Sequence, residues 1–214
     1  AAYSSSAGEL WMGYENGDVV RYSPASGTVG STRLGDGHRI TGLGETRSGG
    51  VLAASANGDI FEISVDLDAS RAIPLTQSCL NKFTELGEIT AADQDLLWLA
   101  TRGDGPLLLD MASGTCSSPN YDEGDENELG HAVIHDIHFD TISKSTLIAS
   151  DQGLFIVDSN LNAKLIATEG SRASDTEIVS ISRGKGDLFW IGTYTGLYYL
   201  VPTVFETNAK FAEG

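Results

Sequence analysis

The sequence predicts an all-β protein, a β-propeller of about five four-stranded antiparallel blades. A phrase of aromatic, aliphatic and small residues recurs five times in the 214-residue chain, at residues 10–17, 51–58, 97–101, 146–153 and 189–196. The glycines that end or follow these phrases lie 41 to 48 residues apart, at Gly17, Gly58, Gly105, Gly153 and Gly196. A repeat period in the forties is typical of propeller blades. No long stretch carries the apolar spacing and the two caps of a helix.

The last unit shows the four-strand pattern most clearly. Residues 178–181, 188–193 and 197–201 are rich in β-branched and aromatic side chains and are separated by glycine-containing turns, one of them at residues 183–187. A weak fourth strand is expected near residues 208–212. Extending the pattern over the chain predicts one domain, residues 1–214, with blades at 1–38, 39–86, 87–131, 132–175 and 176–214. Five units either close as a small ring or form an arc of a larger propeller.

Turn chemistry supports the hairpins between second and third strands. Asn16-Gly17 and Asn57-Gly58 each sit between apolar runs. Asn-Gly is the preferred pair for a type I′ turn, which needs two positive φ angles. Two tight hairpins of this type are therefore expected.

A small residue stands at the same place in every unit, two positions after a Trp or Leu. These small residues are Gly13, Ala54, Ala100, Ala149 and Gly192. A missing side chain lets another sheet approach closely. We therefore expect the tryptophans before them to pack between neighbouring sheets, with a ligand-stacking platform as the alternative; they are Trp11, Trp98 and Trp190.

Composition excludes some classes of partner. The net charge is −17, with 30 acidic and 13 basic residues, so nucleic-acid backbones and anionic lipid surfaces would repel the chain. No run of about 18 apolar residues exists to cross a membrane. No nucleic-acid or membrane contact is expected of this segment. No signal peptide is recognised at residue 1, and the chain is interpreted as mature protein or as a piece of something longer.

The two cysteines, Cys79 and Cys116, both follow a third strand in adjacent units, where the outer strand should lie. A disulfide between neighbouring blades would fit an oxidising compartment. Two separate thiols are the other interpretation.

The strand phrase resembles a known repeat. Residues 189–200 read Phe-Trp-Ile-Gly-Thr, a two-residue turn and then Gly-Leu-Tyr-Tyr-Leu. Residues 97–110 and 10–22 follow the same scheme, and units two and four match it without the Trp. This phrase resembles the two-component-regulator propeller repeat, and residues 121–137 resemble that family's connection between blades. The resemblance covers nearly the whole chain.

The resemblance implies a function as well as a fold. In that family the repeats form periplasmic sensor propellers that precede a transmembrane helix and a cytoplasmic output, such as a histidine kinase or a diguanylate cyclase. A ligand-sensing module, often for saccharides, is implied. The family usually has seven blades or multiples of seven, and five units depart from that number.

Three histidines stand close together, at His131, His135 and His138. Because side chains alternate along a strand, His135 and His138 should face opposite sides, and zinc could be held only by a distorted strand. The interpretation we favour places one histidine in the central channel and exposes the others. The acidic run 122–128 offers oxygen ligands for calcium but lacks the spacing of an ion-wrapping loop. No metal and no cofactor are predicted.

Aspartates recur near the hairpin turns, at Asp18, Asp59 and Asp104. Their expected role is turn chemistry, and an acidic ring that holds a cation or a polyol is the alternative. No nucleophile elbow, phosphate-binding glycine loop or metalloprotease motif is present. The chain is therefore expected not to be an enzyme.

The leading hypothesis is a non-enzymatic, extracytoplasmic ligand-binding propeller of a bacterial two-component-type signalling protein, periplasmic or extracellular. Its ligand would be a small molecule or an oligosaccharide, bound by the loops before first strands and by the second-to-third-strand hairpins. The residues predicted by position are Tyr14, Glu15, Asn16, Arg102, Asp104, His131, His135 and Tyr194. Two alternatives stay open. One is a polysaccharide lyase or hydrolase with His135 and Asp136 converging, and the other is a scaffold segment that self-associates, or docks another propeller segment, through its blade edges.

Overall fold

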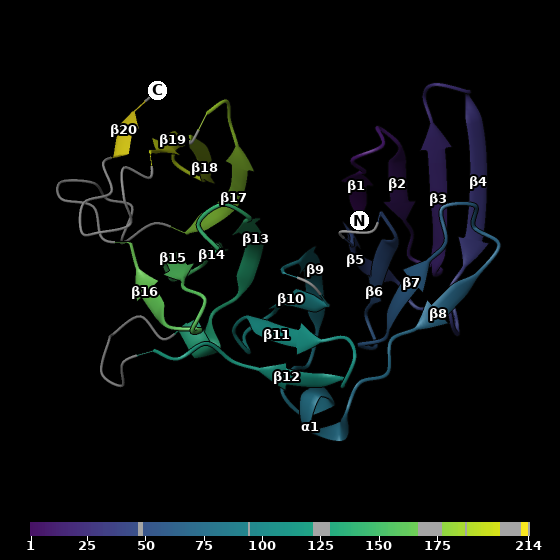
Figure 1. Ribbon diagram of the computed structural model, residues 1–214, viewed down its shortest axis with the longest axis horizontal. Helices are drawn as coiled ribbons and strands as arrows, with labels where there is room; N and C mark the ends of the chain where they lie inside the picture. The colour runs from purple at the N-terminus through teal and green to yellow at the C-terminus, as the bar shows by residue number, and fades with distance from the viewer. Residues whose placement is uncertain are drawn as a thin grey trace. The chain divides into compact units, whose positions relative to one another are not determined.

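A computed structural model describes residues 1–46, 49–93, 95–121, 129–166, 177–186 and 188–201, together with the backbone of 211–213. Five four-stranded antiparallel sheets make up the fold (Figure 1). In each sheet the strands neighbour one another in chain order, so every sheet is a simple meander. The prediction of five four-stranded antiparallel units is confirmed.

The sheets are numbered 1 to 5 along the chain. Sheet 1 comprises β1 (Ala2–Ser4), β2 (Leu10–Gly13), β3 (Asp18–Ser23) and β4 (Thr28–Arg33). Sheet 2 comprises β5 (Ile40–Glu45), β6 (Val51–Ser55), β7 (Ile60–Ile63) and β8 (Ser70–Ala72). Sheet 3 comprises β9 (Leu86–Ala91), β10 (Leu96–Thr101), β11 (Leu107–Asp110) and β12 (Thr115–Ser117). Sheet 4 comprises β13 (Ile134–Asp140), β14 (Ser145–Ser150), β15 (Gly153–Val157) and β16 (Ala163–Leu165). Sheet 5 comprises β17 (Ile178–Arg183), β18 (Phe189–Thr193), β19 (Leu197–Leu200) and β20 (Phe211–Glu213).

The chain divides into two compact units. Unit 1 is residues 1–102 with 107–117, and it contains sheets 1, 2 and 3. Unit 2 is residues 103–106 with 118–214, and it contains sheets 4 and 5. The expected weak fourth strand of the last unit appears as β20, paired with β19. The acidic run 122–128 and residue Asp187 lie outside the described residues.

Each unit is held together by apolar clusters between successive sheets. In unit 1, one cluster joins Trp11 and Val19 of sheet 1 to Phe61 and Ile63 of sheet 2. A second cluster joins Leu52, Ala54 and Ile60 of sheet 2 to four leucines of sheet 3, namely Leu97, Leu99, Leu107 and Leu109. In unit 2, a third cluster joins sheets 4 and 5. Burial of these side chains, at about 25 cal/mol per Å² of apolar surface, drives the stacking of the sheets.

The small residue of the repeat has the expected role in sheet 1. A Cβ atom on Gly13 would clash with the side chain of Ile40, which belongs to sheet 2. Gly192 differs, because a Cβ atom added there would first meet the hydroxyl of Ser180, which belongs to the same sheet. Two further glycines, Gly42 and Gly44 of β5, face main-chain oxygens of the segment that forms β9. These positions bring the first strands of sheets 2 and 3 together backbone to backbone.

Trp11 follows the packing prediction. Trp11 is buried in the cluster between sheets 1 and 2, and Trp98 is buried as well. Trp190 is only half-buried and meets Tyr199 of its own sheet edge to face, with ring centroids 6.1 Å apart. The interpretation as packing residues therefore holds for Trp11, and the ring of Trp190 contacts a cross-strand neighbour.

The predicted type I′ turns are wrong. Gly17 and Gly58 have positive φ angles, but Asn16 and Asn57 do not. The amide of Gly17 donates to the carbonyl of Tyr14, as in an ordinary turn, and the glycine then forms the left-handed position of a bulge. Each asparagine instead hydrogen-bonds the aspartate two residues on. This side-chain bond favours the three-residue loop over the two-residue loop.

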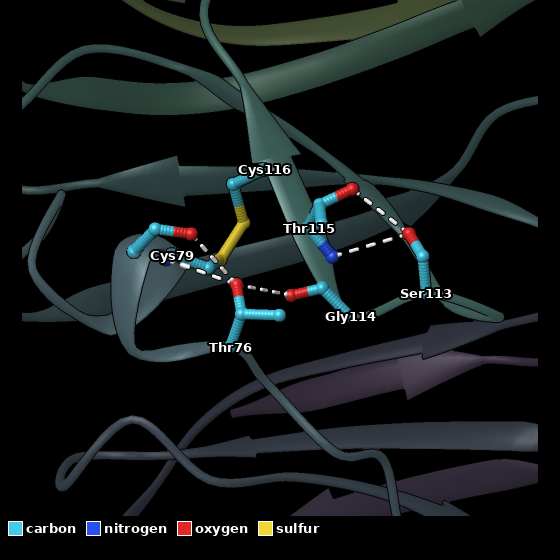
Figure 2. Close-up of a disulfide and its surroundings, with 7 residues drawn as sticks. Thr76, Cys79, Ser113, Gly114, Thr115 and Cys116 are labelled. Atoms are coloured by element: carbon cyan, nitrogen blue, oxygen red, sulfur yellow. Dashed lines mark hydrogen bonds between the residues drawn. A yellow bond between two sulfur atoms is a disulfide. The ribbon is translucent and has the colours of Figure 1, made fainter.

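A short helix links sheets 2 and 3 where an outer strand was expected at Cys79. α1 (Gln77–Leu80) places Cys79 inside the core, and Cys116 lies on β12. The two residues form a disulfide with Cα atoms 5.0 Å apart (Figure 2). The bond therefore ties the segment between two sheets to the outer strand of sheet 3. A four-residue helix is too short to show the periodicity of a longer one.

Thr76 fixes the start of α1. Its hydroxyl accepts a hydrogen bond from the amide of Cys79 and donates one to the carbonyl of Gly114 (Figure 2). The amide of Thr76 donates to the same carbonyl. Thr is a preferred N-cap residue because its oxygen satisfies an orphan amide. The cap thus links the helix to the turn before β12.

One 3₁₀ turn, η1 (Leu129–His131), precedes sheet 4. Among the described residues, no helix is long and apolar enough to cross a membrane.

Candidate functional site

A row of four charged side chains crosses unit 1 at the ends of three successive sheets. Glu15 lies in the β2–β3 hairpin and Arg102 directly follows β10, in the β10–β11 hairpin. Arg39 and Glu85 stand immediately before the first strands β5 and β9. We call these four residues the charged row.

The charged row alternates in sign and centres on one carboxylate. Arg39 Nη2 donates to Glu85 Oε1 at 2.8 Å, and Arg102 Nε lies 3.4 Å from the same oxygen. Arg39 Nε lies 3.9 Å from Glu15 Oε2. The Arg102 side chain is 59% exposed and that of Glu15 is 88% exposed. Ion pairs this open contribute about 0–1 kcal/mol to stability, so their partners can be exchanged for a ligand at little cost.

The backbone beneath the charged row is fixed by hydrogen bonds between hairpins and the segments before first strands. The amide of Ile40 donates to the carbonyl of Tyr14, and the amide of Ala56 donates to that of Arg39. The amide of Arg102 donates to the carbonyl of Glu85. These bonds place solvent-exposed side chains on a rigid scaffold, the arrangement that binding loops commonly use.

Two other predicted residues stand beside this row. Tyr14 is exposed and directly precedes Glu15, and Asn16 holds the turn through Asp18. Asp18 also pairs with Arg33, whose Nε lies 2.7 Å away. The hydrogen bond from Arg33 and that from Asn16 lower the pKa of Asp18. The turn role expected of Asp18 is therefore observed, and its carboxylate is already engaged.

Sequence reasoning named Glu15 and Arg102 but missed Arg39 and Glu85, which join them. Arg39 and Glu85 occupy the same place in the repeat, one residue before the first strand. Aligning the units at that place, rather than at the hairpin glycines alone, would have found them.

In unit 2 the structure places the predicted residues in a different setting. His135 of β13 has its Nε2 atom 2.7 Å from Glu177 Oε1, although this close pair is not aligned as a hydrogen bond. Tyr194 is 75% exposed in the β18–β19 hairpin, and His131 lies in η1. Asp104 belongs to the short 103–106 segment of unit 2. Glu177, like Arg39 and Glu85, stands one residue before a first strand.

Asp136 follows His135 in β13 and also contacts the neighbouring sheet. Asp136 Oδ2 accepts a hydrogen bond from the amide of Ile181 at 2.6 Å and so ties sheet 4 to sheet 5.

His138 is a packing residue rather than a site residue. Its ring meets Phe189 of sheet 5 edge to face, with centroids 5.1 Å apart. Burial lowers the pKa of His138, which keeps the imidazole neutral near pH 7. Neighbouring Asp140 is buried, accepts hydrogen bonds from Ser143 and Ile142, and pairs with Arg183 at 2.7 Å. The contacts with Phe189 and Arg183 join sheets 4 and 5.

Within the described part of the chain, no three His, Cys, Asp or Glu side chains gather as metal ligands do. A hollow of about 440 Å³ lies at the other end of sheet 2, lined by Gly50, Glu62, Ser64, Val65 and Arg71 among others. The Glu62 and Arg71 side chains that line it form an ion pair of 2.6 Å.

No known protein family and no curated relative matches the sequence. Solved structures match over nearly the whole chain at low identity. A catalytically inactive virginiamycin B lyase from Staphylococcus aureus, solved with quinupristin, has a TM-score of 0.72 and 15% identity, covering 99% of this chain and 68% of that one. The extracellular domain of BT3049, a putative hybrid two-component system from B. thetaiotaomicron, has a TM-score of 0.72 and 14% identity, covering 100% of this chain and 28% of that one.

Two further solved structures match the chain in the same way. The β-propeller domain of Cps50 (Swd1) from Myceliophteria thermophila has a TM-score of 0.68 and 13% identity, covering 99% of this chain and 69% of that one. The WD40 repeats of RRP9 reach a TM-score of 0.73 at 13% identity, with 99% and 64% covered. The chain thus has a β-propeller fold, as the repeats predicted, and spans about two thirds of most of these neighbours. Similarity at this identity establishes the fold alone, because one propeller scaffold serves unrelated functions.

Proposed function

We propose that this chain is a non-enzymatic, ligand-binding β-propeller module of the extracytoplasmic sensing part of a bacterial two-component-type signalling protein. The observation that carries the proposal is the charged row of unit 1. It combines two open guanidinium groups, two carboxylates and the exposed ring of Tyr14 on a hydrogen-bonded scaffold.

The chemistry of the charged row suits a polar ligand. Guanidinium and carboxylate groups offer donors and acceptors side by side for hydroxyl groups, and an aromatic ring supplies an apolar surface with a polar edge. A saccharide presents both kinds of surface. The proposed ligand is therefore a small molecule or oligosaccharide that displaces part of the ion-pair network.

Two further observations support the location and the signalling context. The Cys79–Cys116 disulfide fits a chain that folds in an oxidising compartment such as the periplasm. One of the structural neighbours is the extracellular domain of a putative hybrid two-component system. Both observations favour a periplasmic or extracellular position for this module.

The test is binding at the charged row. The chain would be screened by thermal shift against neutral gluco-oligosaccharides and oligogalacturonates, and each hit would be measured by calorimetry. The double variant Arg39→Ala/Arg102→Ala should lose at least tenfold in affinity, and Arg71→Ala, a matched exposed ion-pair arginine at the other end of sheet 2, should not. Equal affinity of both variants and the wild type would exclude the charged row as the site.

A second candidate function rests on the His135–Glu177 pair. An imidazole beside a carboxylate is a candidate acid–base couple, and the virginiamycin B lyase among the neighbours shows that a chain of this fold can be an enzyme. The enzyme hypothesis requires turnover of the same oligosaccharides that falls at least a hundredfold in His135→Ala. Absence of turnover with retained binding would support the sensing module.

A further inference from the structure

Within each unit, one sheet packs on the next through the same set of positions. The second and third strands of a sheet each point alternate residues to its two faces. In sheet 2 the face toward sheet 1 carries Val51, Ala53, Phe61 and Ile63, and all four are buried. The equivalent face of sheet 3, toward sheet 2, carries Leu97, Leu99, Leu107 and Leu109. We call this four-residue face of a sheet its leading face.

The opposite face of each sheet also has a recurring composition. In sheet 1 the face toward sheet 2 carries Trp11, Gly13 and Val19, and in sheet 2 the face toward sheet 3 carries Leu52, Ala54 and Ile60. Both sheets thus carry a large residue and then a small residue on the second strand, and an apolar residue on the third strand. We call this the trailing face, and each interface within a unit joins one trailing face to the next leading face.

Sheet 1 has a leading face of the same chemistry that no described residue of unit 1 covers. By strand register, its four residues are Leu10, Met12, Val20 and Tyr22. Val29 of β4 pairs with Tyr22 and extends the apolar surface outward. Leu10 is 43% exposed, Val29 is exposed, and the other three are half-buried. These residues lie on the side of sheet 1 away from the Trp11 cluster.

Sheet 5 has a trailing face in the same condition within unit 2. Its positions are filled by Trp190, Gly192, Leu197 and Tyr199, on the side opposite to the cluster that joins sheets 4 and 5. Leu197 is 55% exposed and the two aromatic rings are half-buried. The large residue and the glycine stand in the register that Trp11 and Gly13 occupy in sheet 1.

We propose that two copies of this chain associate head to tail, with the trailing face of sheet 5 of one copy packing on the leading face of sheet 1 of the other. The chain carries both halves of an interface that it already builds twice within unit 1 and once within unit 2. A molecule with two different complementary patches pairs through a heterologous contact. Apolar sheet faces left open on both halves are of the kind that mark association surfaces.

The net charge of the chain opposes this association, so the association should depend on salt concentration. Each copy carries a net charge of −17, so two copies repel one another at low ionic strength. Salt screens that repulsion, with a Debye length of about 30 Å at 0.01 M and about 8 Å at 0.15 M. Association through apolar faces should therefore strengthen as salt is added, which separates it from a contact made by ion pairs.

The experiment uses two variants of the full chain, each with one face blocked. Val20→Glu places a charge on the leading face of sheet 1, and Leu197→Glu places one on the trailing face of sheet 5. Light scattering at 0.15 M salt should show the wild type growing beyond its 22.6 kDa monomer mass with concentration, and each variant remaining a monomer. An equal mixture of the two variants keeps one intact interface and should form a 1:1 pair that grows no further. Ile142→Glu, at an exposed turn residue outside both faces, should behave as the wild type.

Three results would overturn the proposal. The wild type could remain a monomer at every concentration and salt level. The two variants could fail to pair when mixed. Val20→Glu could lower the melting temperature of the monomer markedly, which would mean that the face is covered within one chain. Ligand binding at the charged row is unaffected by these outcomes, so the proposed function is tested separately.

Discussion

The leading faces of sheets 1 and 2 have the same pattern and different surroundings. In sheet 2, Phe61 and Ile63 are buried under Trp11 and Val19 of sheet 1. In sheet 1 the equivalent residues, Val20 and Tyr22, are half-buried. The same pattern of apolar residues is therefore buried where sheet 1 packs on sheet 2 and half-buried on the outer side of sheet 1.

Substitutions at matched residues of these two faces should differ most in their effect on the free energy of unfolding. Phe61→Ala should destabilise the folded chain by about 3–5 kcal/mol, because it leaves a cavity between two sheets. Val20→Ala, at the equivalent position on the uncovered face, should cost about 1 kcal/mol or less, since solvent already reaches this side chain. Urea denaturation midpoints at low protein concentration measure both. Equal losses would show that the face of sheet 1 is covered in the monomer.

The next effect concerns the covered junction of sheets 2 and 3. Cys79→Ser/Cys116→Ser removes a cross-link between residues 37 apart in sequence and should cost about 2–4 kcal/mol, because the unfolded chain gains freedom. Thermal unfolding with and without reductant checks this. The wild type should lose stability in reductant while the double variant does not respond. An unchanged melting temperature for the wild type in reductant would contradict a stabilising bond.

Acid should weaken the junction of sheets 4 and 5 in unit 2. Burial raises the pKa of Asp140, but the hydrogen bonds from Ser143 and Ile142 and the charge of Arg183 outweigh it, so the pKa is lowered. The stability from Asp140 is present at neutral pH and is lost as pH falls below about 4 toward the lowered value. His138, whose pKa burial lowers, is favoured neutral, so its contribution declines as pH falls below about 6.5.

Unfolding followed from pH 7 to pH 3 measures this dependence. The wild type should lose stability over this range, first through His138 and then through Asp140. His138→Gln should flatten the upper part of the curve and leave the lower part. A curve for His138→Gln that coincides with the wild type would exclude His138 as a contributor.

Substitutions in the charged row should change the free energy of unfolding least. Arg39→Ala/Arg102→Ala should change the free energy of unfolding by about 1 kcal/mol or less, because exposed ion pairs contribute little. The same denaturation assay checks it, with Arg71→Ala as the matched control. A loss above about 2 kcal/mol would mean that the row serves the fold rather than a ligand.

Periodicity was enough to predict the five sheets, since each unit repeats its strands, its small residue and its hairpin glycine. It could not predict α1, because four residues are too few to show a period and tertiary contacts of Thr76 and Cys79 fix the helix. The turn type was missed because the side chain of Asn16 donates a hydrogen bond to the side chain of Asp18, and the Asn-Gly dipeptide alone does not reveal this bond.

The candidate site was predicted in part for a similar reason. Glu15 and Arg102 were found from hairpin positions, which belong to the local pattern. Arg39 reaches Glu15 and Glu85 only because neighbouring sheets stack, so these two ion pairs join residues of different sheets. Glu85 reaches Arg102 through the pairing of β9 with β10 inside sheet 3. The hydrogen bond from the amide of Ile181 to the carboxylate of Asp136 likewise joins two sheets, so the sequence pattern of one repeat does not reveal it.

Hydroxyl-radical footprinting read by mass spectrometry tests whether the face pattern that is buried between sheets 1 and 2 is open on the outer side of sheet 1. Met12 and Tyr22 report on the leading face of sheet 1, and Phe61 reports on the covered face of sheet 2. We predict strong modification of Met12 and Tyr22 in dilute protein, increasing protection as concentration rises, and protection of Phe61 throughout. Protection of Met12 and Tyr22 already at the lowest concentration would show that this face of sheet 1 is covered in the monomer.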